Sequence, residues 1–363
     1  MSITRTVLMS LLSAVLVAGL VGVADAKGKG KRGGKNLDRA ADDFPHIDAN
    51  GDDKISREEW LRRGNFDLLD KNGDGFITLR ELRGLYATHN DKNYSFEPVG
   101  PRGQDGGRDE SALAAKIPLG QIDDYVACAI GRPRSCDAEP SKARGLIETG
   151  LGPRFPDNAL CPGIDDYWAM SYDFKRTRES YHGGLDVPVP WGTPMLAAAD
   201  GTVVGLFEGL KSARGKEVVL RHSPEQTGLG MWVYTSYGHM DGLPDMELGQ
   251  RVRMGEYLGP TGNSGVGGMN KGKQSNKRRP AIHFVAVYST DERYAQGRSV
   301  IIPVDGWWMD PLALYRTSPP FDSAGTKALP IDQKFVSIPA MFEDGTLSSP
   351  DTKVIWPYAC KPR

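Results

Sequence analysis

The 363-residue chain is poor in histidine and cysteine, with only six and four of them. Its formal net charge is −1, so it lacks the basic excess with which proteins neutralise nucleic-acid phosphates. Beyond residue 26 no apolar run is long enough to cross a bilayer. No two cysteines have the Cys-x-x-Cys spacing of a structural zinc site. These absences argue against a membrane-spanning body, a cysteine zinc module and a nucleic-acid partner.

The longest apolar run lies at the N-terminus, over residues 7–23. It is followed by Ala24-Asp25-Ala26, which has the small-x-small form of a cleavage site. We therefore expect a signal peptide at residues 1–26, with an uncleaved membrane anchor as the alternative. The mature chain is then secreted or periplasmic, and residues 27–36 form a flexible basic tether suited to anionic surfaces.

The four cysteines agree with export, because an even number in an exported chain favours disulfides over metal binding. Four cysteines allow three pairings. We favour Cys128 with Cys136, which closes a short loop, and Cys161 with Cys360, which ties the C-terminal tail to the start of the main domain.

Residues 70–81 match an EF-hand calcium loop. Oxygen ligands stand at loop positions 1, 3 and 5, Gly75 provides the turn at position 6, and a glutamate closes the loop at position 12. The predicted calcium ligands are Asp70, Asn72, Asp74, Phe76 through its carbonyl group, Thr78 and Glu81. The alternative is an acidic turn that never binds calcium.

A second loop with the same spacing lies at residues 48–59, but Asp53 stands where the turn glycine belongs. Aspartate tolerates the left-handed backbone only at some energetic cost, and Pro45 shortens the entering helix, so we expect the weaker site here. Its predicted ligands are Asp48, Asn50, Asp52, Lys54, Ser56 and Glu59. The EF-hand pair should occupy residues 37–92, with Ile55 and Ile77 paired across the loops and a small core of Phe66, Leu68, Leu69, Leu82 and Tyr86.

Three histidines outside the calcium loops, together with one aspartate, suggest a second kind of metal site. His182, Asp186 and His283 supply the three nitrogen or oxygen ligands of a catalytic zinc site, and His239 is left for proton transfer. Two ligands of one zinc lie about 3–3.5 Å apart, whereas residues four apart on a straight strand are about 13 Å apart. Gly183-Gly184 opposes a helix, so we expect a glycine bend. His283 lies in an apolar, branched run that predicts a buried strand.

Around these residues the sequence resembles the zinc endopeptidases of the lysostaphin and LytM type, which cut peptide cross-links of bacterial cell walls. The resemblance covers residues 178–290 in family order. Beyond the metal-binding residues it includes Gly192-Thr193-Pro194, Ala198 to Val203, Tyr237-Gly238-His239, Gly249 to Val252, and Thr261 to Gly265. It implies that His182, Asp186 and His283 bind zinc, that His239 assists catalysis, and that residues 146–318 fold as an antiparallel β-sheet groove, giving an α+β chain.

The chain departs from the family at one catalytic position. The family usually ends with His-x-His, and here the first histidine is replaced by Ala281. A polar, basic insertion at residues 267–279 stands where the family has a tight turn. We expect a solvated loop there, with a basic rim of the groove as the alternative. His222 and the tyrosines Tyr234 and Tyr237 are predicted to be structural; the alternatives are a direct role for His222 and tyrosines that line the groove.

The resemblance implies a zinc metalloendopeptidase acting on peptidoglycan peptides. The EF-hand loops add calcium in the N-terminal lobe, and we expect a monomer. The alternative that Ala281 favours is a wall-binding or regulatory module that activates other cell-wall hydrolases, and a third is a calcium-dependent scaffold. Residues 93–145 are predicted to be a linker with short helices around the first cysteine pair. Residues 319–363 should be a C-terminal extension packed irregularly against the domain.

Overall fold

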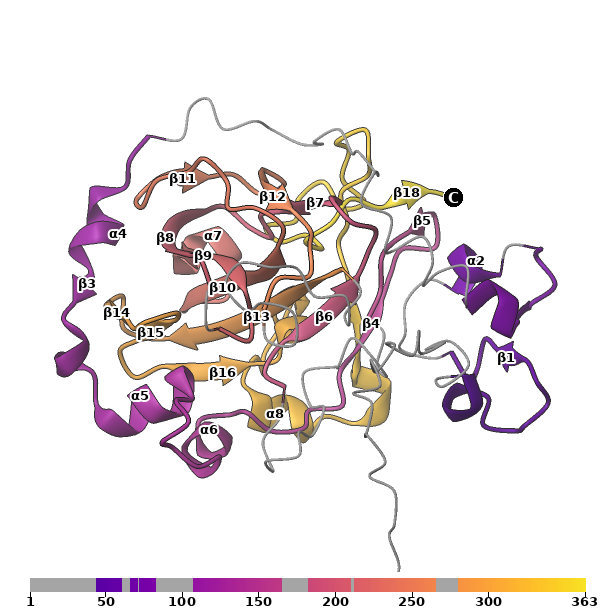
Figure 1. Cartoon of the computed structure of the whole chain (residues 1–363), viewed down its shortest axis with the longest axis horizontal. Helices are drawn as coiled ribbons and strands as arrows, with labels where there is room; N and C mark the ends of the chain where they lie inside the picture. The colour runs from indigo at the N-terminus through magenta and orange to yellow at the C-terminus, as the bar shows by residue number, and fades with distance from the viewer. Residues whose placement is uncertain are drawn as a thin grey trace, which may run out of the picture. The chain divides into compact units, whose positions relative to one another are not determined.

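The computed structural model describes residues 44–60, 66–70, 72–82, 107–164, 182–209, 212–265 and 280–363. Its main sheet has the strand order β11-β8-β9-β10-β13-β16, and β6 also pairs with β13 (Figure 1). All of these pairs are antiparallel, which confirms the expected α+β fold built mainly on an antiparallel sheet. The strands are β6 (Leu185–Pro188), β8 (Gly201–Phe207), β9 (Lys216–His222), β10 (Trp232–Met240), β11 (Arg251–Val252), β13 (Ala281–Ser289) and β16 (Trp307–Met309).

The central strands are buried along almost their whole length, so both faces of the sheet are covered. That burial explains why β13 is a nearly continuous apolar and aromatic run rather than an alternating pattern. A separate two-stranded antiparallel sheet pairs β7 (Pro194–Leu196) with β12 (Tyr257–Pro260). In the sequence, β7 comes between β6 and β8, and β12 comes between β11 and β13. The short helix α7 (Pro224–Thr227) connects β9 to β10 and starts with a capping box at Ser223.

Short elements precede the main sheet, as the sequence predicts. They are α4 (Glu110–Ala114), β3 (Lys116–Ile117), the 3₁₀ helix η1 (Leu119–Gln121), α5 (Asp124–Gly131) and α6 (Glu139–Ala143). β3 pairs in parallel with β14 (Tyr294–Gln296), which pairs with β15 (Ile301–Pro303). Ile122, Val126 and Ile130 belong to the same hydrophobic core as the central strands. The Asp109 N–H donates to the Gly249 carbonyl at 2.7 Å, so this end of the predicted linker is part of the fold.

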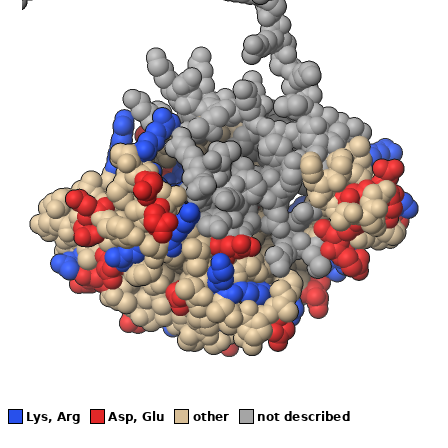
Figure 2. All heavy atoms as spheres, turned by 90° about the horizontal axis from the view of Figure 1, so that it is seen from below, with Lys and Arg blue, Asp and Glu red and all other residues tan. Residues whose placement is uncertain are grey.

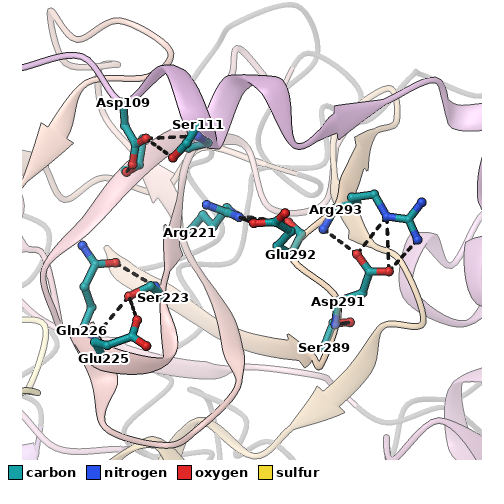
Figure 3. A network of polar contacts seen from close by, with 12 residues as sticks. Asp109, Ser111, Arg221, Ser223, Glu225, Gln226, Ser289, Asp291, Glu292 and Arg293 are labelled. Atoms are coloured by element: carbon teal, nitrogen blue, oxygen red, sulfur yellow. Dashed lines mark hydrogen bonds and ion pairs between the residues drawn. The ribbon is translucent and has the colours of Figure 1, made fainter.

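The segment after β13 is fixed to the main sheet by polar contacts (Figure 3). The Arg221 guanidinium donates to the Glu292 carbonyl at 3.1 Å and lies 3.6 Å from its carboxylate. The Tyr234 hydroxyl donates to the same carbonyl at 3.2 Å. Within the segment, Arg293 and Asp291 form an ion pair at 2.6 Å. Because Arg221 and Tyr234 are cross-strand partners on β9 and β10, these bonds hold the segment against one face of the sheet.

The chain after the main sheet packs against the main core. It contains η2 (Pro311–Tyr315), and the predicted C-terminal extension from residue 319 adds α8 (Ser323–Lys327), η3 (Ile331–Gln333), β17 (Phe335–Ser337) and β18 (Lys361–Pro362). β17 pairs with β4 (Gly152–Arg154) and β18 with β5 (Ala159–Leu160). Trp356 and Tyr358 are fully buried in the main core. The buried Lys334 ammonium donates to three backbone carbonyls, those of Thr149, Thr326 and Lys327.

Both predicted disulfides are confirmed. Cys128 is bonded to Cys136, and Cys161 to Cys360. The second bridge closes a separation of 199 residues, and such a closure typically stabilises a fold by about 2–4 kcal/mol.

The predicted EF-hand lobe contains a helical turn at residues 44–47, β1 (Ile55–Ser56), α2 (Phe66–Leu69) and β2 (Phe76–Ile77). Ile55 and Ile77 pair across the loops as predicted, and Asp53 has the left-handed φ of 62°. The buried core residues are Phe44, Ile47, Ile55, Trp60, Phe66, Leu69, Ile77 and Leu82. The Leu68 side chain and Tyr86 lie outside the described residues, as do the predicted signal peptide, the predicted basic tether and the insertion at residues 267–279.

Two carboxylates of the loop at residues 70–81 accept hydrogen bonds from within that loop. The Asp70 carboxylate accepts the N–H groups of Asp74 and Gly75 at 3.1 and 2.8 Å. Glu81 Oε2 accepts from the N–H and hydroxyl groups of Thr78 at 2.8 and 2.7 Å. These bonds connect the side chains at positions 1 and 12 of the loop to its own main chain.

Glu81→Gln should remove most of the calcium affinity of this loop, because a neutral amide cannot replace the bidentate carboxylate at position 12. Titration calorimetry of the full chain measures the effect, and Glu59→Gln in the other loop serves as the matched variant. We expect the larger loss from Glu81→Gln. Equal calcium binding by wild type and Glu81→Gln at millimolar concentration would refute the loop assignment.

Acidic and basic side chains lie among one another on the face shown in Figure 2. That mixture agrees with a formal net charge of −1. Across the described ranges, no helix combines the length and the apolar character needed to cross a membrane.

Candidate metal centre and active site

The strand register brings two of the three predicted zinc ligands together. On β13, His283 is the direct cross-strand partner of Asp186 on β6, and on its other side it pairs with Gly238 of β10. Side chains of direct partners lie about 4.5–5.5 Å apart at Cβ. Asp186 Oδ1 is accordingly 2.8 Å from His283 Nδ1. Residues that are 97 positions apart in the chain thus meet at one point of the sheet.

His182 reaches this point through the predicted glycine bend. Gly183 has φ 82°, in the region that favours glycine. The bend leads into β6, which starts at Leu185. His182 Nε2 is 3.6 Å from Asp186 Oδ1, and the rings of His182 and His283 lie 4.6 Å apart between centroids.

The three side chains fit a zinc ion. His182, Asp186 and His283 each offer one ligand atom, and these atoms lie within 4.8 Å of one another. All three residues are buried. Two imidazoles and one carboxylate are a donor set of catalytic zinc, which keeps a further position open for water or substrate. The structure therefore assembles the predicted ligand set from a bend and two strands.

His239 lies beside this group with its ring orientation fixed. It follows Gly238 at a bulge in β10 and has the left-handed φ of 64°. Its Nδ1 is 2.6 Å from the Ser264 carbonyl oxygen. Because a carbonyl only accepts, Nδ1 carries the proton, and the lone pair of the neutral ring is on Nε2. Nε2 is 3.8 Å from Asp186 Oδ1, so the basic nitrogen faces the metal ligands.

The bulge at His239 is held by a loop that the sequence analysis missed. The His239 N–H donates to the Arg214 carbonyl at 2.6 Å. The Arg214 side chain in turn lies 3.3 Å from the fully buried carboxylate of Glu217. Burial raises the pKa of Glu217, against the opposing effects of Arg214 and Ser236. No sequence pattern marks these residues, because their role depends on a backbone bulge.

Ala281 occupies the place where the family has its additional histidine. It lies on β13, two residues before His283, so the two side chains point to the same face of the sheet. Its cross-strand partner is Pro188, and it is 2% exposed. The face that carries the metal ligands thus has a methyl group where the family has an imidazole.

His222, Tyr234 and Tyr237 are structural, as predicted. His222 is fully buried, with Nδ1 2.6 Å from the Asp200 carbonyl and Nε2 2.7 Å from the Thr235 hydroxyl. The Tyr237 hydroxyl accepts the Ala198 N–H at 2.8 Å. Burial lowers the pKa of His222 to about 4.

His222 should make the fold sensitive to acid. Its pKa is lower in the folded than in the unfolded chain, so the unfolded state binds the extra proton, and stability falls as pH drops from 6.5 toward 4. When His222 is fully protonated in the folded chain, the free energy of unfolding has fallen by about 3 kcal/mol. Urea unfolding of the metal-free protein at pH 7 and 4.5 measures it, and His222→Gln should show a smaller difference between the two pH values. An unchanged difference in that variant would contradict the prediction.

Gly184 is the second glycine of the bend and has no room for a side chain. A Cβ there would lie 2.7 Å from His283 Cε1 and 2.9 Å from the Phe284 carbonyl oxygen. Gly184→Ala should therefore displace His283 and weaken metal binding by tenfold or more, as losses of ligand support typically do. Gly120→Ala, where a Cβ meets nothing within 4 Å, is the control. Equal zinc affinity in both variants, measured by chelator competition, would show that the bend tolerates the methyl group.

Comparison with known proteins agrees with this arrangement. The model of peptidase family M23 matches residues 180–296, which include all four site residues, and an EF-hand model matches residues 66–86. Cell division protein DipM of Caulobacter vibrioides is 28% identical over 194 residues, covering 50% of this chain and 28% of DipM. The DD-carboxypeptidase/endopeptidase Mpg of Neisseria meningitidis serogroup B is 36% identical over 84 residues, covering 23% of this chain and 17% of Mpg.

Parts of this chain are also similar to solved structures of peptidases. A peptidase M23 structure from Pseudomonas aeruginosa is 28% identical, covers 31% of this chain and 40% of its own, and has a TM-score of 0.22. The catalytic domain of the antimicrobial peptidase lysostaphin from Staphylococcus simulans is 22% identical, with 30% and 69% covered and a TM-score of 0.24. The chain spans less than a third of the length of the curated relatives named above.

Proposed function

Because residues 180–296 carry a peptidase family M23 domain, we propose that this protein is a secreted zinc metalloendopeptidase that hydrolyses peptide cross-links of bacterial peptidoglycan. The observation that carries the proposal is the convergence of His182, Asp186 and His283 on one buried point, with the basic nitrogen of His239 facing it. Two disulfides favour an extracytoplasmic location. The relative Mpg is named a carboxypeptidase and endopeptidase, which supports peptide-bond hydrolysis.

His182, Asp186 and His283 would hold the zinc ion. Bound there, zinc acts as a Lewis acid and lowers the pKa of water toward 7. His239 contributes through Nε2, whose lone pair can accept the proton released when water attacks the scissile carbonyl. Its Nδ1–H bond to the Ser264 carbonyl keeps the ring in this orientation and stabilises the imidazolium that forms. The charged ring can then return the proton to the leaving amine.

Calcium is proposed to bind the N-terminal lobe and to stabilise it. The support is the EF-hand match at residues 66–86 together with the inward carboxylates of Asp70 and Glu81. Outside the cytosol, extracellular modules bind calcium at 10⁻⁴–10⁻³ M, so modest affinity suffices for a structural role. Asp53 has a left-handed φ, so we expect the loop at residues 48–59 to bind calcium more weakly than the loop at residues 70–81.

A second candidate is a regulatory module that binds the wall and activates other hydrolases. Ala281 favours it, since one imidazole of the family's catalytic pair is absent. A relative named as a cell division protein is compatible with such a role. The complete set of zinc ligands opposes it, because wall binding alone does not require three metal-binding side chains in register.

Digestion of purified peptidoglycan by the zinc-loaded protein, followed by mass analysis of the fragments, tests the proposal. We expect new peptide termini that identify the cleaved cross-link. Asp186→Ala, which removes a zinc ligand, should release none. If the zinc-loaded wild type also releases none, the regulatory module becomes the better description.

A further inference from the structure

One side chain from outside residues 180–296 contacts the main chain of a zinc ligand. Arg132 follows α5, and its Nη1 donates to the His182 carbonyl at 3.0 Å. It lies within the loop that the Cys128–Cys136 disulfide closes. Arg132 caps the helix with a left-handed φ of 47°, and its N–H donates to the Cys128 carbonyl. The disulfide loop thus presents a guanidinium to the glycine bend.

Trp308 completes this contact. Its ring lies 5.6 Å from the Arg132 guanidinium, and its Nε1 donates to the Ala129 carbonyl of α5 at 2.9 Å. Trp308 belongs to β16, which pairs with β13, the strand that carries His283. The indole therefore joins α5 to the sheet beside the metal site.

The bend is packed directly against this pair. A Cβ on Gly183 would lie 2.9 Å from Arg132 Nη1 and 3.0 Å from Trp308 Cζ3. Two successive glycines have more conformational freedom than any other dipeptide, so His182 needs support from outside the bend to stay in place. A hydrogen bond from a charged donor is among the strongest available, and here it ends on the carbonyl group of the ligand itself.

We infer that Arg132 is a positioning residue for His182, and that the Cys128–Cys136 loop is part of the support of the zinc site. The inference rests on the proposed zinc binding. Arg132 acts through the backbone carbonyl of His182. Loss of such support typically weakens metal binding by 10–100-fold.

Arg132→Gly gives a sharp test, because glycine adopts the φ of this position without strain. The disulfide loop should keep its backbone while the guanidinium is lost. Arg134→Ala, at an exposed position of the same loop, is the matched control. Zinc affinity is measured by competition with a chromogenic chelator, and the visible spectrum of the Co²⁺-loaded protein reports the ligand geometry.

We expect about tenfold or greater weakening of zinc binding and an altered Co²⁺ spectrum in Arg132→Gly, and wild-type behaviour in Arg134→Ala. Arg132→Lys should recover part of the affinity, because it restores a charged donor. The double variant Cys128→Ser with Cys136→Ser should weaken zinc binding while retaining Arg132.

The outcomes separate the inference from the proposed function. A wild type that binds no zinc would overturn both. A wild type that binds zinc, with equal affinity and spectrum in Arg132→Gly, would overturn the inference alone. A fall in the unfolding temperature of metal-free Arg132→Gly large enough to account for the lost affinity would make Arg132 a residue of general stability, and this too would overturn the assignment.

Discussion

His239→Ala is expected to bind zinc as tightly as the wild type and to hydrolyse peptidoglycan about 10²–10⁴-fold more slowly. The magnitude is that of losing a general acid–base or a preorganised electrostatic group. The structure supports this separation, because His239 makes its bond through Nδ1 to the Ser264 carbonyl and leaves Nε2 directed at the site. With Ala281 in place of the second imidazole, proton transfer rests on His239.

Zinc content by elemental analysis and initial rates of cross-link cleavage check this expectation together. Asp186→Ala is the contrasting variant, and it should lose both metal and activity, because Asp186 Oδ1 lies within reach of all three site histidines. His46→Ala, an exposed histidine of the calcium lobe, should change neither. If His239→Ala keeps wild-type turnover, another group transfers the proton. If it loses zinc, His239 supports the metal site rather than the chemistry.

The candidate metal ligands could be proposed from the sequence because their spacing carries physical information. A histidine and an aspartate four residues apart cannot share an ion on a straight strand, and the intervening glycines allow the bend that the structure contains. His283 lies on an apolar, branched run that predicts a buried strand, and the structure has a buried strand there. The cross-strand pairing of His283 with Asp186 was not predictable, since register depends on contacts across the whole sheet.

The supporting residues could not be found in the same way. Ser264 acts through its carbonyl group and Arg214 through both its carbonyl and its side chain, and every residue type has a carbonyl. The left-handed φ of His239 could not be predicted from the sequence either, because it arises from a bulge in β10. Arg132 lies 50 residues before His182 and outside the family match. Only the fold brings it to the bend.

The sequence also did not show how far the main hydrophobic core extends beyond the central strands. Residues of the predicted linker and of the C-terminal extension, among them Val126, Ile130, Trp356 and Tyr358, share one hydrophobic cluster with the central strands. Their sequences show little periodicity, because they lie in short elements or irregular chain rather than on long strands. The disulfide between Cys161 and Cys360 was a better indicator of this packing than any hydrophobic pattern.

Ala281→His is expected to raise the rate of cross-link cleavage by at least tenfold, since a second acid–base or electrostatic group is worth 10²–10⁴-fold when well placed. The strand geometry supports the gain. Ala281 and His283 point to the same face of β13, and their cross-strand partners on β6 are Pro188 and Asp186. The position is 2% exposed, so the imidazole must displace neighbouring groups to fit.

Rates and zinc affinities of Ala281→His and Ala281→Leu separate chemistry from bulk. Leucine has a side chain of similar size without an ionisable nitrogen, so it should lower activity or leave it unchanged, whereas histidine should raise it. Zinc affinity should stay near the wild-type value in the histidine variant, because the three ligands are retained. A rate increase that depends on the imidazole would show that the wild-type site is a working peptidase operating with one histidine fewer. A zinc-loaded wild type that cuts no wall preparation, and gains nothing from Ala281→His, would instead identify the domain as a regulatory module with its zinc ligands preserved.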